Sequence, residues 1–136
     1  MKPLASNNLS TEQLNQLTGQ VIDAAMTVHR ELGPGLLESA YEACLVCELN
    51  ERGIKAVGQV GLPITYKSMQ LEVGYRVDVI VEDAVILELK AVSAIAPVHE
   101  AQLLSYLRLS GAKVGLLINF HVPLLKDGIK RLVHKF

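Results

Sequence analysis

Glu88 and Lys90 are charged residues inside a segment that otherwise has the composition of a buried strand. The segment, residues 85–90, reads VILELK, and its remaining members are all valine, isoleucine or leucine. Because side chains alternate along a strand, Glu88 and Lys90 point to one face together with Ile86. Charges that interrupt a buried strand need a reason, and a functional site is one.

Asp78, on the preceding apolar segment, is the residue expected opposite Glu88. The apolar face of that segment is formed by Val77, Val79 and Val81. The apolar faces of the two segments coincide when Val81 pairs with Val85 across a three-residue turn. This register sets Asp78 directly across from Glu88. Carboxylates in that arrangement repel each other unless a cation lies between them.

A hard divalent cation would relieve this repulsion, since Mg²⁺ is commonly held by one or two carboxylates together with water and phosphate oxygens. Lys90, one pleat further along, would then be a fixed positive charge that orients a water nucleophile or stabilises a phosphorane-like transition state. The spacing alone leaves a second interpretation open. In it, Glu88 and Lys90 lie on the solvated face of an edge strand and Asp78 is nearby by chance.

The elements that must position these residues follow from the periodicity of the rest of the chain. Apolar residues recur every three or four positions in three stretches, which predicts helices over residues 10–32, 36–52 and 97–111. Ser10 and Gln13 have the spacing of a capping box at the start of the first helix. The GPG sequence at residues 33–35 ends that helix.

Short segments rich in β-branched residues predict strands. The predicted strands cover residues 62–68, 71–81, 84–92 and 113–120, with an edge strand over residues 128–136. The first three would form an antiparallel meander, and the crossover helix before residues 113–120 would make that strand parallel to its neighbour. The expected fold is an α/β, three-layer α/β/α domain with a mixed central sheet.

The bulk composition is that of a single globular domain. The chain has 136 residues, of which 50% are hydrophobic and 20% are charged. We expect a flexible segment over residues 1–9 and a single domain over residues 10–136. No segment has the apolar run of a signal peptide or the ~20 continuous apolar residues needed to cross a bilayer, which predicts a soluble, cytoplasmic protein without a membrane partner.

The formal net charge is -1, so any binding of nucleic acid must be local. A basic cluster near the C-terminus could contact a phosphate backbone or form a solvated face, and it consists of Lys126, Lys130, Arg131 and Lys135. Arg76 could bind phosphate or neutralise Asp78. Cys44 and Cys47 have no two further ligands at recognisable spacing, so we expect core or half-buried thiols rather than a metal site.

Six segments in a fixed order resemble the protein family named for its GxxExxY motif, within the PD-(D/E)XK nuclease superfamily. The segments are GLLESAY, YRVDVIVED, ILELKAV, HEAQLLSYLRLSG, GLLINF and LKDGIKR. Together they extend from about Val21 to Val133. The (D/E)XK motif is ELK at residues 88–90, and the proline-aspartate pair of the superfamily name is here VD at residues 77–78.

The resemblance implies a restriction-endonuclease-like core that binds a divalent metal, Mg²⁺ or Mn²⁺. The metal ligands that it implies are Asp78, Glu88, the Leu89 carbonyl, and Glu38 bound directly or through water. Lys90 would assist the attacking water, and Gln102 and Tyr106 would approach the site from the third helix. The implied catalytic residues are therefore Lys90, Glu38, Gln102 and Tyr106.

The favoured hypothesis is a metal-dependent nuclease that hydrolyses phosphodiester bonds of DNA or RNA by activating water. A second hypothesis is a nucleic-acid-binding or adaptor module that retains the scaffold without hydrolysis. A third and weaker one is a structural zinc or redox protein that uses Cys44 and Cys47. A homodimer or a larger nucleic-acid-processing assembly is compatible with the nuclease hypothesis, but only by analogy between folds.

Overall fold

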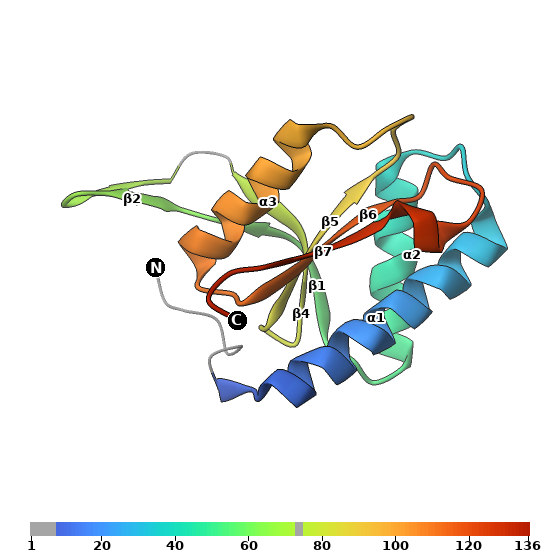
Figure 1. Ribbon diagram of the computed structural model, residues 1–136, viewed down its shortest axis with the longest axis horizontal. Coiled ribbons are helices and arrows are strands. Elements are labelled where there is room, and N and C mark those ends of the chain that lie inside the picture. The colour runs from blue at the N-terminus through green and yellow to red at the C-terminus, as the bar shows by residue number, and fades with distance from the viewer. Residues whose placement is uncertain (1–7, 73–74) are drawn as a thin grey trace.

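The computed structural model describes residues 8–72 and 75–136 and contains a five-stranded sheet with helices on both faces (Figure 1). The helices are α1 (Thr11–Leu32), α2 (Glu38–Glu51) and α3 (Pro97–Ser110), with a short 3₁₀ helix, η2 (Leu125–Gly128). α1 and α2 cover one face of the sheet and α3 covers the other. The predicted three-layer α/β/α arrangement is therefore confirmed.

The central sheet has the strand order β1-β4-β5-β6-β7. Its strands are β1 (Ala56–Gly61), β4 (Arg76–Val81), β5 (Val85–Lys90), β6 (Val114–Asn119) and β7 (Ile129–Val133). β5 and β6 are parallel, and the other neighbouring pairs are antiparallel. The crossover through α3 produces the parallel pair, as the sequence predicts, and β7 is the predicted edge strand.

α1 begins and ends where the sequence predicts. Gln13 N–H donates to Ser10 Oγ at 3.0 Å, and Ser10 N–H donates to Gln13 Oε1 at 2.8 Å, which completes the capping box. At the other end Gly33 has φ 68°, and its N–H donates to the His29 carbonyl. Glycine suits this position because a side chain would be strained at positive φ.

β1 lies at an edge of the sheet, in a segment that the sequence analysis left unassigned. It contains Gly58 and Gly61, which are weak strand formers, and Gln59 has φ 54°, in the left-handed region. Pairing with β4, rather than local propensity, makes this segment a strand. The prediction that the sheet begins with a meander at residue 62 is therefore wrong.

The segment after β1 forms a projecting hairpin instead of a strand of the central sheet. β2 (Ile64–Tyr66) and β3 (Met69–Leu71) make a separate two-stranded sheet, which extends away from the body of the molecule (Figure 1). β4 begins at Arg76, so the predicted continuous strand from residue 71 is also wrong. Local pattern identifies an extended segment but not the sheet that it joins.

Two apolar clusters fill the faces of the central sheet. On the side of α1 and α2, the members from β4 and β5 are Val79, Val81, Val85, Leu87 and Leu89. Ile80 and Ile86 pack on the α3 side, as the alternation predicts. Val77 belongs to the α3 cluster as well, so its predicted face is wrong. The alternation breaks at Asp78, opposite the left-handed Gln59 of β1.

Residues 1–7 of the predicted flexible segment lie outside the described residues, so its flexibility stays a prediction. Leu9 packs against the cluster on the α1 and α2 side. Within the described residues, none of the helices combines the length and apolar character that crossing a membrane requires.

Candidate active site

β4 and β5 stop pairing just before the acidic residues that the sequence singles out. Their ladder runs from Val81 opposite Val85 to Val79 opposite Leu87, which confirms the predicted register. Asp78 and Glu88 follow where the main-chain ladder ends. Beyond this point the side chains of the two acids, rather than main-chain carbonyls, accept the hydrogen bonds that join the strands.

Each of the two carboxylates occupies the place of a main-chain carbonyl. Leu89 N–H donates to Asp78 Oδ2 at 2.7 Å, and Asp78 N–H donates to Glu88 Oε1 at 3.3 Å. These reciprocal bonds tie each acid to the other's strand. The Asp78 side chain lies close enough to Glu88 to raise the pKa of Glu88.

Glu88 is nearly enclosed, with 4% of its surface exposed. Burial, and next the negative charge of Asp78, raise the pKa of Glu88 from 4.5 to about 8. The positive charge of Lys90 and the Asp78 N–H lower this pKa but do not offset the two larger effects. At neutral pH and without a cation, the pair therefore holds a proton, because two charged carboxylates in contact repel.

α3 contributes a tyrosine to the same place. Tyr106 is 5% exposed, and burial together with the charges of Glu88 and Asp78 raises the pKa of its phenol. Gln102, one turn earlier on α3, lies close enough to lower the pKa of Tyr106, but it does not offset these larger effects. Lys90 is half-buried at the end of β5. The phenol is therefore a neutral hydrogen-bond donor beside the acidic pair.

α2 contributes a glutamate from the opposite face of the sheet. Glu38, the first residue of α2, accepts a hydrogen bond from Ala91 N–H at 3.3 Å, directly after Lys90. A pocket of about 310 Å³ separates α2 from the acidic pair, and it is lined by Glu38, Ser39, Glu42, Gln59, Asp78 and Leu89. Asp78 connects the predicted residue on α2, Glu38, with the predicted residues on α3. It lines the pocket beside Glu38, and its charge also raises the pKa of Tyr106.

Glu42 is a site residue that the sequence analysis missed. It lines the pocket with Glu38 and Asp78, and Gln59 Nε2 donates to its Oε1 at 2.6 Å. Burial raises the pKa of Glu42, and the charge of Asp78 raises it further. One signal was available: Glu38 and Glu42 are four residues apart and so share a helix face. Gln59 could not be found, because β1 itself was not predicted.

The acidic pair fits a divalent cation by the chemistry of its donors. Asp78 and Glu88 offer hard oxygen ligands from adjoining strands, and Glu38 and Leu89 border the pocket beside Asp78. Among the described residues, no three His, Cys, Asp or Glu side chains form a ready ligand cluster. Mg²⁺ needs no such cluster, because it takes one or two carboxylates and keeps several waters.

Other residues singled out in the sequence have structural partners other than Asp78 and Glu88. Tyr41 is fully buried, stacks on Phe120 with ring centroids 4.4 Å apart, and donates its hydroxyl to the Gly33 carbonyl. Arg76 donates to the Gln59 carbonyl at 3.3 Å. In the C-terminal basic cluster, Lys130 pairs with Glu100 at 2.9 Å.

Comparison with known protein families adds one finding. The sequence model of the family described as the PD-(D/E)XK nuclease superfamily matches residues 15–132, which covers every candidate site residue. No curated protein and no solved structure matches the chain.

Proposed function

Since the chain belongs to the PD-(D/E)XK nuclease superfamily, we propose that it hydrolyses phosphodiester bonds of DNA or RNA with Mg²⁺ or Mn²⁺ held by Asp78 and Glu88. The observation that carries the proposal is the reciprocal pair of hydrogen bonds that holds each of these carboxyl groups on the other's strand where β4 and β5 stop pairing. A proton or a cation must accompany the pair, and a divalent cation is what phosphodiester hydrolysis uses.

The ligands that we propose for the ion are Asp78, Glu88, the Leu89 carbonyl, and Glu38 directly or through water. Asp78 and Glu88 each keep a second carboxylate oxygen outside the bonds that join the strands. When bound, the ion supplies positive charge against the phosphate oxygens and lowers the pKa of water. The resemblance to the GxxExxY family supports the contribution of Glu38, which stands in the GLLESAY segment.

Lys90, Gln102 and Tyr106 are proposed to act on the water and the phosphate. Lys90 ends β5, two residues after Glu88, so its ammonium group is available to orient the attacking water and to stabilise charge that develops on phosphorus. Tyr106 stays protonated, because the factors that raise its pKa disfavour the phenolate. Its hydroxyl, with Gln102 one turn earlier on α3, can then donate a hydrogen bond to a phosphate oxygen.

Nuclease assays with Mg²⁺ or Mn²⁺ on DNA and RNA substrates test the proposal. We expect Lys90→Ala to reduce the cleavage rate by about 10²-fold or more, the range for loss of a group that stabilises charge in the transition state. Asp78→Asn should abolish metal-dependent cleavage while retaining an oxygen that accepts from Leu89 N–H. Lys55→Ala is the matched control, because Lys55 pairs with Asp83 at the other end of the β4-β5 hairpin.

Equal activity of the wild type, Lys90→Ala and Asp78→Asn would reject the proposal. Binding of nucleic acid without cleavage under any of these metals would instead support the second hypothesis, a binding or adaptor module that keeps the nuclease scaffold.

A further inference from the structure

We propose that the groove between the β2-β3 hairpin and α3 binds single-stranded nucleic acid next to the acidic pair; the proposal rests on the proposed function for the identity of the polymer. The groove has a volume of about 340 Å³, and it is lined by Ile64, Tyr75, Gln102, Ser105, Tyr106, Arg108 and Leu109. We call it the hairpin groove. A chain seated in it would pass directly to the candidate active site, because Gln102 and Tyr106 belong to both.

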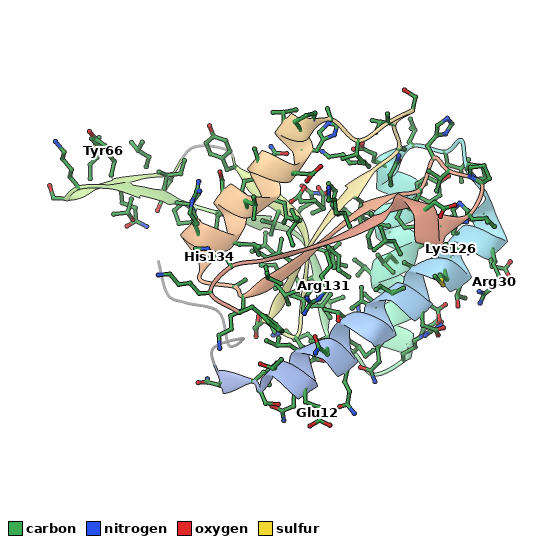
Figure 2. All side chains as sticks on the ribbon, in the orientation of Figure 1. Glu12, Arg30, Tyr66, Lys126, Arg131 and His134 are labelled. Atoms are coloured by element: carbon green, nitrogen blue, oxygen red, sulfur yellow. The ribbon has the colours of Figure 1, made fainter. Side chains whose placement is uncertain are left out.

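Aromatic side chains at the groove and further out on the hairpin are exposed in the way that stacking on bases requires. Tyr75 is 46% exposed and lies near enough to Tyr106 to influence its ionisation. Tyr66 lies on the projecting hairpin, beyond the residues that line the groove, and is 58% exposed (Figure 2). Bases have a π-face that stacks on such rings, and each stacked base strengthens binding appreciably.

Positive charges accompany these rings. Lys67 Nζ lies 5.4 Å from the centroid of the Tyr66 ring, in the two-residue turn of the hairpin. Arg108 borders the groove, and its guanidinium donates to Ser105 Oγ at 3.1 Å. Among the described residues neither cation has an acidic partner, whereas Arg52, Lys55 and Lys130 do. Lys67 and Arg108 are therefore available to phosphates.

The chemistry of the groove favours an unpaired strand over a duplex. In a duplex the faces of the bases are stacked on their neighbours and cannot reach Tyr75 or Tyr66, whereas unpaired bases can be splayed onto aromatic rings. The combination of exposed rings with cations is complementary to a polyanion that carries bases. An apolar protein segment would leave Lys67 and Arg108 without counter-charges.

Binding of a fluorescein-labelled single strand and of the same sequence as a blunt duplex, measured by anisotropy in EDTA, tests this proposal. We expect the single strand to bind more tightly. Tyr75→Ala and Arg108→Ala should each weaken single-strand binding about tenfold, the loss expected for one stacked base or one cation. Tyr75→Phe keeps the ring and should bind as the wild type does.

Phe136→Ala is the matched control. The Phe136 ring is 40% exposed and lies 4.6 Å beneath the Arg131 guanidinium, so it offers the same aromatic and cationic pair outside the hairpin groove. The Kd of the Phe136→Ala variant for the single strand should equal that of the wild type. Thermal unfolding of each variant establishes that the fold is retained, which the exposure of Tyr75 and Arg108 leads us to expect.

Wild-type affinity of both Tyr75→Ala and Arg108→Ala would overturn the proposal, and so would an equal loss of duplex binding. Self-association that these variants abolish, without oligonucleotide binding, would assign the groove to a second copy of the chain. Cleavage assays separate this outcome from failure of the proposed function. Groove-dependent binding without metal-dependent cleavage would refute the function alone, and cleavage unaffected by the groove variants would refute the groove alone.

Discussion

Asp78 and Glu88 each use one carboxylate oxygen to join β4 to β5, and the other oxygen takes no part in these bonds. The bonds from Leu89 N–H and Asp78 N–H satisfy main-chain donors that would otherwise have no partner once the ladder ends. Replacing either acid by alanine therefore removes a structural bond as well as a proposed metal ligand. An amide is the better substitution, because its carbonyl oxygen still accepts the bond while the charge is gone.

The raised pKa of Glu88 predicts how the stability of the metal-free protein depends on pH. Burial and the charge of Asp78 raise that pKa from 4.5 to about 8, so the folded state binds a proton that the unfolded state releases between these values. The stability associated with the proton is fully present below pH 4.5, decreases as the pH rises, and is lost above about 8.

Thermal unfolding in EDTA between about pH 5 and about pH 9 measures this effect. Wild-type stability should decline toward alkaline pH more steeply than that of Glu88→Gln, which carries no titratable group at this position. Mg²⁺ should restore wild-type stability at the alkaline end, because it binds the ionised pair in the folded state only. If the stability of the wild type and of Glu88→Gln declined in parallel with pH, the pH dependence could not be assigned to Glu88.

At the scale of elements, α3 reaches the site because β6 gives it close access to the sheet. Gly115 of β6 has no side chain, and a Cβ placed there would lie 2.9 Å from Leu103 Cδ1 and 3.2 Å from the Ile86 carbonyl oxygen. The helix that carries Gln102 and Tyr106 therefore packs directly on the strand next to β5.

Gly115→Ala should destabilise the fold by about 1–3 kcal/mol, the usual cost of overpacking a core. Gly61→Ala is the control, since this strand glycine has an ordinary φ and no described heavy atom within 4 Å of the added Cβ. Urea denaturation gives both free energies of unfolding. A Gly115→Ala variant as stable as Gly61→Ala would show that α3 shifts without cost.

The sequence predicts the elements whose signals are local. The capping box at Ser10 defines the start of α1, and the pairing of Val81 with Val85 across a three-residue turn was enough to bring Asp78 to Glu88. β1 was missed because its identity depends on a partner 20 or so residues away and its glycines weaken the local signal.

Side chains that meet across layers were predictable only in part. Alternation along β5 identifies Glu88 and Lys90, whereas nothing in the spacing of Glu42 relative to Asp78 indicates that α2 brings them to one pocket. The break in alternation at Val77 had no signal either, because it follows from the irregular backbone of Gln59 in the neighbouring strand.

At the scale of the whole molecule, the net charge of -1 leaves attraction of a polyanion to local groups. If Lys67 and Arg108 make the phosphate contacts, each contributes about 0.7 to the salt dependence for a single strand, so log K against log salt concentration should have a slope of about -1.4. Arg108→Ala should halve that slope and Phe136→Ala should leave it unchanged. A slope steeper than about -3 would indicate that the C-terminal basic cluster also binds.

The two outer strands of the central sheet have a consequence for how the molecule behaves at high concentration. β1 carries a left-handed residue, Gln59, in its middle, and β7 carries Lys130 and Arg131 on opposite faces of the sheet, where they bond to Glu100 of α3 and Asn15 of α1. An incoming β-strand from another molecule meets a distorted main chain at one border and two cations at the other, both of which disfavour its addition. Both edges of the sheet therefore disfavour the strand addition by which concentrated protein grows into fibrils.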